Sequence, residues 1–446
     1  MRKTAFYHLL LVFLVFGIAG AALASGLSAT VHKRSATVYS KPDFKAPAVA
    51  TLARKDPVTI NDQLGLWYQV ALSGDRSGYI RVNEVRLAAS GATGSEDTMH
   101  ILMTGKSGSG RVTETAGVRG LDESELRSAS FDARQLREME GNRASTASAE
   151  RYAQQHHWSR TSVPWAGEPA PDHGNVSQAD AREGSSATRS LLRKVGRGML
   201  GSMLHVGEKA IPKSEEELSD EELALGPLIA GRVLGARPLW DNAGAQHRVN
   251  VIGRWLASQT SRPELPWTFG VIDSPEYNAF AAPGGYILVT RGLYQLVGND
   301  QELAGVLAHE ITHVVQRDHY EVIRKQQTMS GAKELISSRV HTGGGLAGSL
   351  ARDYVEKNGA SILLTSLDRD AEYRADEFAE VYLARSGMNP LALYAILQKM
   401  LAMGSASGGL AELYKTHPSL DDRLDQIDQR AYGTLQPYLR RSVADL

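Results

Sequence analysis

The pentapeptide His309-Glu310-Ile-Thr-His313 has the residue types and spacing of a metal site. Apolar residues at helical spacing from Leu303 to about Arg317 predict that it lies on a helix. Two histidines four residues apart are separated by about 40° around a helix axis, so both imidazoles can bind one ion. The chain contains no cysteine, so any metal must be held by histidine and carboxylate.

A third ligand must come from elsewhere in the chain, and the sequence offers two candidates. His319 stands ten residues after His309, as in metzincin proteases, but the glycine that turns the chain back in those proteins is missing here. If the helix continues, His319 points about 120° away from His313. The better candidate is a predicted helix with Glu372 and Asp376 four residues apart. One carboxylate would bind the metal, and the other would accept a hydrogen bond from a ligating imidazole.

This part of the chain resembles the gluzincin family that contains the HtpX-like and BepA-like bacterial proteases and the CaaX prenyl proteases. The resemblance spans about residues 226–428 and rests on separate blocks in a fixed order. These blocks are Asn278–Leu293, Glu302–His309, Glu372–Asp376, and Thr416-His417-Pro418 with Arg423. It implies a mainly helical, α+β gluzincin metalloprotease domain over residues 216–446.

The resemblance also implies roles for individual residues. One zinc ion per chain would be held by His309, His313 and Glu372. Glu310 would be the catalytic base, and Asp376 would orient a ligating histidine. His417 is similar to the family's mobile histidine, which either occupies the open zinc position or faces the transition state.

Substrate binding is expected at a strand before the metal-binding helix. The run Tyr286–Thr290 reads as an edge strand, and such a strand can pair with the main chain of a substrate. The residues expected to do so are Tyr286, Ile287, Leu288 and Val289. Pairing of this kind depends little on side chains, which suits partly unfolded chains. The resemblance to the family implies that the substrates are unfolded or misassembled envelope proteins.

The N-terminus has the pattern of an export signal. Arg2 and Lys3 precede an apolar run from Leu9 to Ala22, and Ala22-Leu23-Ala24 fits a signal-peptidase site. We expect residues 1–24 to be a cleaved signal peptide and the protein to be periplasmic. An uncleaved membrane anchor is the alternative, since the run approaches the length of a span.

Residues 27–88 read as short β-strands separated by turns, which predicts a small all-β barrel. The order of a Trp67-Tyr68 strand, a Ser-Gly-Asp turn and a strand with Tyr79 resembles the bacterial SH3-like (SH3b) module. These aromatic residues either form the barrel core or present a platform for a cell-wall or peptide ligand. The whole chain is thus predicted to be multidomain, with an SH3-like barrel followed by the protease domain.

Residues 89–215 are rich in Ser, Gly, Ala, Arg and Glu and predict a partly helical, low-complexity linker. Within them, Leu191–Met203 could form a basic amphipathic helix that packs on the protein or makes a peripheral membrane contact. Two glycine patterns do not predict nucleotide sites. Gly105-Lys106-Ser107 lacks the earlier glycine of a P-loop, and Gly196–Gly201 follows a helix-like segment rather than a strand.

Charge and composition restrict the function further. The 446 residues include 49 Lys and Arg and 50 Asp and Glu, a net charge of −1. A nucleic-acid partner is therefore not expected, because such proteins usually carry a basic excess. Two alternatives to an envelope protease stay open: a non-proteolytic chaperone or cell-wall-binding protein with a latent metal site, and a peptidoglycan cross-bridge peptidase.

Overall fold

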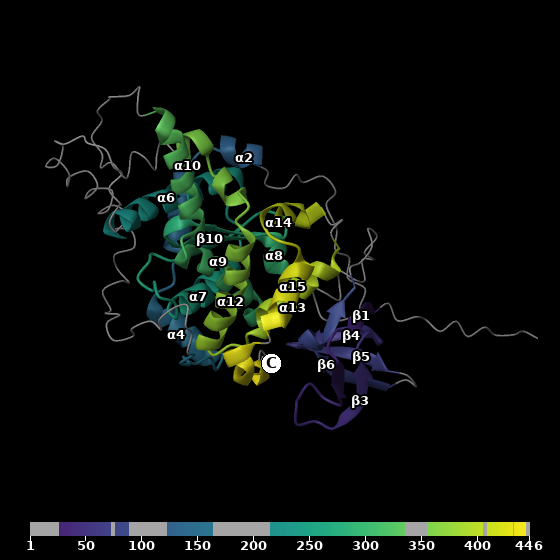
Figure 1. The fold of residues 1–446 in the computed structure, drawn as a ribbon. Helices are drawn as coiled ribbons and strands as arrows, with labels where there is room; N and C mark the ends of the chain where they lie inside the picture. The colour runs from purple at the N-terminus through teal and green to yellow at the C-terminus, as the bar shows by residue number, and fades with distance from the viewer. Residues whose placement is uncertain are drawn as a thin grey trace, which may run out of the picture.

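The computed structural model describes residues 26–72, 76–88, 123–163, 215–334, 355–404, 408–430 and 432–442 (Figure 1). The predicted signal peptide, the two glycine patterns and the predicted basic helix at 191–203 lie outside these residues. None of the helices in the described ranges has the length and apolarity that a membrane span needs.

The N-terminal region forms one antiparallel sheet of seven strands in the order β3-β2-β6-β5-β4-β1-β7. Burial alternates along strands such as β1, as expected where one face packs on a core. The strands are β1 (Leu27–Val31), β2 (Ser35–Tyr39), β3 (Ala48–Ala53), β4 (Pro57–Leu64), β5 (Trp67–Leu72), β6 (Arg76–Arg81) and β7 (Val85–Leu87), with the 3₁₀ helix η1 (Val82–Glu84) before β7. The prediction of an all-β region is confirmed.

The sheet does not close into the predicted barrel. The end strands β3 and β7 do not pair within the described part of the chain. The end of the sheet at β7 is instead covered by Gln398, which comes from helix α13 (Leu391–Ala402). Its Oε1 accepts from Leu87 N at 2.9 Å, and its Nε2 donates to the carbonyls of Val82 and Val85 at 2.6 and 2.9 Å. A side-chain amide thus satisfies backbone groups next to an edge strand.

Of the aromatic residues singled out from the sequence, Trp67 and Tyr68 are buried and Tyr79 is half-buried. Tyr68 is 1% exposed and belongs to the hydrophobic core. Trp67 packs edge-on against Tyr39, and the Arg81 guanidinium lies 5.0 Å from its ring centroid. The SH3-like assignment remains a prediction, and so does a platform for a ligand. Tyr68 itself is part of the core, which is the first of the two alternatives.

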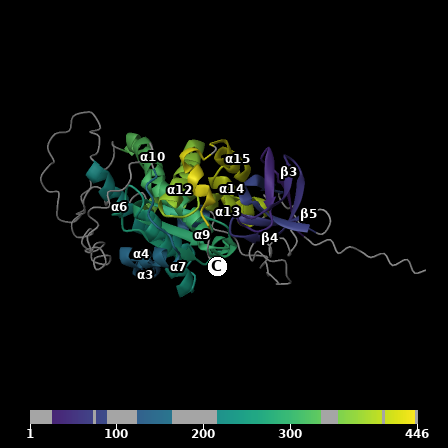
Figure 2. The same ribbon diagram turned by 90° about the horizontal axis from the view of Figure 1, so that it is seen from below.

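Charged groups join the sheet to helix α15 (Leu420–Arg430), and Figures 1 and 2 both show α13 and α15 beside the sheet. Asp428 forms ion pairs with Lys33 and, at 3.1 Å, with Arg86, and His32 Nε2 lies 3.2 Å from the same carboxylate. Arg86 also reaches Asp425 at 2.7 Å. The sheet therefore supplies cations to two aspartates of α15.

Glu84 at this junction predicts a pH effect on stability. Burial raises the pKa of Glu84 to about 7, although the backbone and charge of Arg81 oppose the shift. Ionising Glu84 thus costs more free energy in the folded protein than in the unfolded chain. The free energy of unfolding therefore falls as the pH rises from about 4.5 to about 7. We expect Glu84→Gln to stabilise the protein at pH 8 by roughly 3 kcal/mol, which is a shift of about 2.5 pKa units at 1.36 kcal/mol per unit.

Melting curves of wild type and Glu84→Gln between pH 5 and pH 8 would check this. Glu138→Gln is the control, because the Glu138 side chain is 53% exposed. A difference in melting temperature between wild type and Glu84→Gln that stays constant with pH would contradict the prediction.

The remaining residues build a mainly helical region around a three-stranded sheet in the order β8-β10-β9. Alternate residues of β10 join two different cores: Ile287 and Val289 face one, and Tyr286 and Leu288 the other. Both faces are therefore covered, which explains the continuous apolar runs. The elements that start this region are α6 (Glu215–Ala236), α7 (Ala243–Ala257), β8 (Thr268–Ile272), β9 (Ala279–Ala282), η4 (Pro283–Gly285), β10 (Tyr286–Thr290) and α8 (Arg291–Leu296).

The metal-binding motif lies in the helices that follow this sheet. They are α9 (Asp300–Val315), α10 (Asp318–Glu334), η5 (Ser361–Leu364), α12 (Arg369–Arg385), α13, η6 (Gly408–Leu410), α14 (Ala411–Thr416), α15 and η7 (Gly433–Arg440). The prediction of a mainly helical α+β region is confirmed.

The segment predicted to be a linker contributes to this helical region. It forms α2 (Glu123–Ser128), α3 (Ala133–Gly141) and α4 (Thr146–Gln155). Leu126 and Met139 are fully buried in the core that lines β10, and Asp132 N donates to Gly231 O at 2.9 Å. The helices are short and carry few apolar residues each, so the sequence shows little periodicity.

Candidate metal centre

Helix α9 holds the two motif histidines in the protein interior. The Asn299 side chain caps its start by accepting from Glu302 N at 2.9 Å. All sixteen residues of the helix are buried, and the Nε2 atoms of His309 and His313 lie 3.1 Å apart. The predicted spacing therefore brings both imidazoles to one point.

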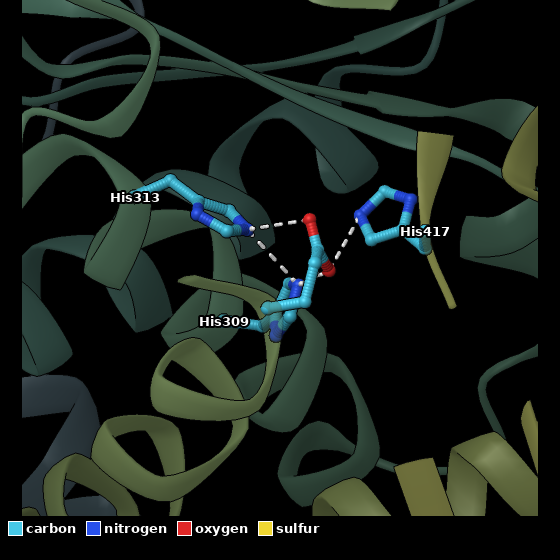
Figure 3. Close-up of side chains that lie close together, drawn as sticks. His309, His313 and His417 are labelled. Carbon is cyan, nitrogen blue, oxygen red and sulfur yellow. Dashed lines mark hydrogen bonds and ion pairs between the residues drawn. The ribbon is translucent and has the colours of Figure 1, made fainter. Parts of the chain in front are cut away.

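Glu372 comes to the same point from α12. Its carboxylate oxygens lie 3.6 Å from His309 Nε2 and 3.7 Å from His313 Nε2. His417 Nε2 is 3.6 Å from the same carboxylate, and Figure 3 shows the three labelled imidazoles around it. One ligand atom from each of these four residues lies within 4.8 Å of the others.

The donor set fits a metal ion. Glu372 Oε2 is buried and accepts no hydrogen bond from any described residue, which is costly unless a cation binds there. A tetrahedral zinc ion with bonds of about 2.0–2.1 Å would hold its ligand atoms about 3.3 Å apart. The distances between His309, His313 and Glu372 are close to this value, so these residues could hold zinc.

Each ligating imidazole is held from its other nitrogen by an aspartate. His309 Nδ1 lies 2.9 Å from Asp376 Oδ1, as the sequence predicted for Asp376. Arg423 donates to both oxygens of Asp376, at 2.5 and 3.0 Å. His313 Nδ1 lies 2.8 Å from Asp318 Oδ2. Such contacts fix the tautomer and orientation of a ligand.

Asp318 is not among the residues predicted from the sequence. It is an acidic residue five positions after His313, and a continuing helix would direct it away from the metal. The helix does not continue: α9 ends at Val315, and Arg317 has a φ of 59°. This left-handed residue redirects the chain into α10 and returns Asp318 to His313.

His319 is not part of the metal-binding group, as predicted, but the reason given for rejecting it is wrong. The chain turns after α9 instead of continuing as a helix. His319 lies close to the site, with its ring centroid 5.9 Å from that of His313. Burial lowers the pKa of His319 to about 4.

Burial and neighbouring charges shift the pKa values of the ionisable groups of the site in different directions. Burial lowers the pKa of His417 to about 3, so this imidazole is neutral at neutral pH. Burial raises the pKa of Glu310. Burial opposes ionisation of Asp376 as well, but the neighbouring Arg423 and His309 hold the pKa of that carboxyl well below its usual range.

A small cavity lies over the metal-binding residues. Glu310, His313, Glu372 and His417 all line it. Its free space is about 10 Å³, room for roughly one water molecule. The cavity is partly open to solvent, and it is bordered by β9, by residues 363–367 and by residues 416–417.

The predicted substrate strand is wrong. Tyr286, Ile287, Leu288 and Val289 form β10, which is the central strand and not an edge. It pairs in parallel with β8 and antiparallel with β9. The edge strand beside the metal-binding residues is β9, and Ala279, Phe280 and Ala281 line the cavity. The error arose because β9 and β10 are consecutive, and their order does not show which one lies outside.

Comparison with known proteins supports the resemblance. A family model described as Peptidase family M48 matches residues 244–431, which contain every residue of the metal centre named above. A Protease HtpX homolog from Desulfatibacillum aliphaticivorans is 30% identical over 219 residues, covering 42% of this chain and 69% of that protein. The chain belongs to peptidase family M48. The predicted gluzincin relationship is thereby confirmed.

Other M48 relatives match over shorter shares of their length. The Beta-barrel assembly-enhancing protease of Escherichia coli strain K12 is 29% identical over 234 residues, 50% of this chain and 46% of that protein. The Mitochondrial metalloendopeptidase OMA1 of Schizosaccharomyces pombe is 28% identical over 166 residues, 37% and 47% of the two chains. The chain spans about half the length of these relatives. The family match does not include the N-terminal sheet.

Proposed function

We propose that this protein is a zinc-dependent endopeptidase that cleaves unfolded or misassembled proteins of the bacterial envelope. The observation that carries the proposal is the buried Glu372 oxygen, which lies beside two imidazoles and has no hydrogen-bond partner among the residues described. Glu310 lines the same cavity and can act as a base. Membership of family M48 supports this reading.

His309, His313 and Glu372 would hold the metal, with Asp376 and Asp318 orienting the imidazoles. When bound, zinc would polarise the scissile carbonyl and lower the pKa of water. Glu310 would accept a proton from the attacking water and pass it to the leaving amine. The edge strand β9 would pair with the substrate main chain.

Support for the substrate class comes from the mode of binding and from the relatives. Main-chain pairing at an edge strand accepts many sequences provided that the substrate is extended. Two bacterial relatives, from Yersinia pestis and Escherichia coli strain K12, carry the name Beta-barrel assembly-enhancing protease. A periplasmic location, reached through the predicted signal peptide, is part of the proposal. A cell-wall or peptide ligand of the N-terminal sheet remains a prediction.

A substrate comparison would test the proposal. Wild type and Glu310→Gln are incubated with casein, with an unfolded outer-membrane protein and with purified peptidoglycan. Cleavage of the proteins by wild type alone would support the endopeptidase. Cleavage of peptidoglycan alone would favour the cross-bridge peptidase. Suppressed aggregation without cleavage would favour the chaperone.

His417 is expected to act as a latch. It lines the small cavity and contacts Glu372, and its Nδ1 lies 2.8 Å from Thr416 Oγ1. We expect His417→Ala to keep its zinc and cleave an unfolded protein faster. The gain would be about tenfold if nine-tenths of the molecules are latched.

Cleavage rates and zinc content of His417→Ala would check this, with the exposed His247→Ala as a matched control. A fall in kcat of roughly 10²–10³ with zinc retained would mean instead that His417 stabilises the transition state. Wild-type kinetics at an unchanged melting temperature would remove His417 from the site.

A further inference from the structure

His319 is a buried polar residue in the cavity to which neither metal binding nor proton transfer assigns a role. It lines the cavity together with Glu310 and His313 and is 9% exposed. Its Nδ1 has no hydrogen-bond partner among the residues that the structure describes. Leaving such a group unpaired costs about 1–3 kcal/mol, so its retention calls for an explanation.

The backbone around His319 is firmly held. Asp318 bonds His313 and also accepts from Arg374 Nη2 at 2.7 Å. On the other side, Tyr320 donates its hydroxyl to Glu221 at 2.8 Å. The imidazole of His319 is therefore placed by anchored neighbours, while its Nδ1 has no hydrogen-bond partner in the described part of the chain.

We infer that His319 positions the substrate by a hydrogen bond to the main chain of the bound peptide. A neutral imidazole offers one donor and one acceptor, and both match groups of a peptide bond. The β9 residues that line the same cavity, Ala279, Phe280 and Ala281, have apolar side chains. A peptide paired with β9 still has main-chain groups directed away from the strand, and these need polar partners.

Two other roles for His319 are less well supported. It is not in the group whose ligand atoms converge for metal binding. Its edge-on ring contact with His313, at 5.9 Å and 74°, could serve only to support that ring. Phenylalanine would keep such a contact and lose the hydrogen bond, so this substitution separates packing from substrate positioning.

The inference rests on the proposed function, and binding tests it without turnover. A peptide that wild type cleaves is titrated into the zinc-loaded Glu310→Gln protein and into the same protein carrying His319→Phe, His319→Asn or His319→Gln. We expect His319→Phe to weaken the dissociation constant about tenfold at unchanged zinc content. Asparagine places an amide near Nδ1 and glutamine near Nε2, so one of them should restore binding.

In the protein with Glu310 intact, His319→Phe should raise KM more than it lowers kcat. The exposed His247→Phe is the matched control. Wild-type affinity in His319→Phe, or failure of both amides to restore binding, would overturn the inference while leaving the proposed function intact. A protein that cleaves no peptide at all would overturn the proposed function, and the inference with it.

Discussion

The Glu310→Gln variant is expected to keep one zinc ion per chain and to lose proteolysis by roughly 10²–10⁴-fold. The carboxylate of Glu310 lines the cavity beside His313 and Glu372 but is not one of the converging ligand atoms. Glutamine has nearly the same shape, so the metal site should survive. The amide cannot accept the proton of the attacking water, so the chemical step should fail.

Zinc content by elemental analysis and cleavage of an unfolded protein by gel or fluorescence would measure the two effects separately. Glu321→Gln is a matched control, because Glu321 lies just beyond the site on α10 with its side chain 44% exposed. Full activity in Glu310→Gln would rule out Glu310 as the base. Loss of zinc together with activity would show that the residue contributes to metal binding.

The Glu372→Ala variant should lose the metal. It removes the only carboxylate in the converging group and leaves two imidazoles and His417. Loss of a contact that merely orients a ligand already costs 10–100-fold in affinity, so loss of the ligand itself should cost more than about 100-fold. Removing the carboxylate also leaves His309 without one of the two acids that favour its protonated form.

Competition with a zinc chelator would measure this change in affinity. Asp370→Ala controls for removing an acid from the same helix, because Asp370 is exposed in the first turn of α12. His319→Ala should retain zinc, since His319 lies outside the metal-binding group. Loss of zinc from His319→Ala but not from Glu372→Ala would mean that the third ligand has been misassigned.

The parts of the site that the sequence predicted share one property, which is local helical spacing. His309 and His313 lie one turn apart on α9, and Glu372 and Asp376 lie one turn apart on α12. In each helix the period fixes the relative direction of the pair. The resemblance to a known family then supplied the pairing between the two helices, which spacing alone could not.

The errors concern contacts that no local period determines. Asp318 reaches His313 only because a single left-handed residue ends α9, and that residue is an arginine rather than a glycine. The substrate edge was assigned to β10 because strand order within a sheet depends on long-range pairing with β8. A barrel was expected because pairing of its end strands would satisfy their free backbone groups. At β7 a side chain distant in sequence, Gln398, contacts the backbone instead, and the sequence does not reveal this contact.

Helix α15 shows that two regions that are separate along the chain can depend on each other for their free energy of unfolding. At one end its Arg423 holds Asp376, and thereby His309; at the other, Asp428 takes its counter-charges from the N-terminal sheet. A fragment that begins after residue 88 would retain every ligand. It would nevertheless leave Asp428, whose side chain is 6% exposed, without the cations of the sheet, and breaking a buried pair costs about 3–5 kcal/mol. We therefore expect the protease region and the sheet to unfold together. An enzyme that lacks the sheet would have a weakened metal centre.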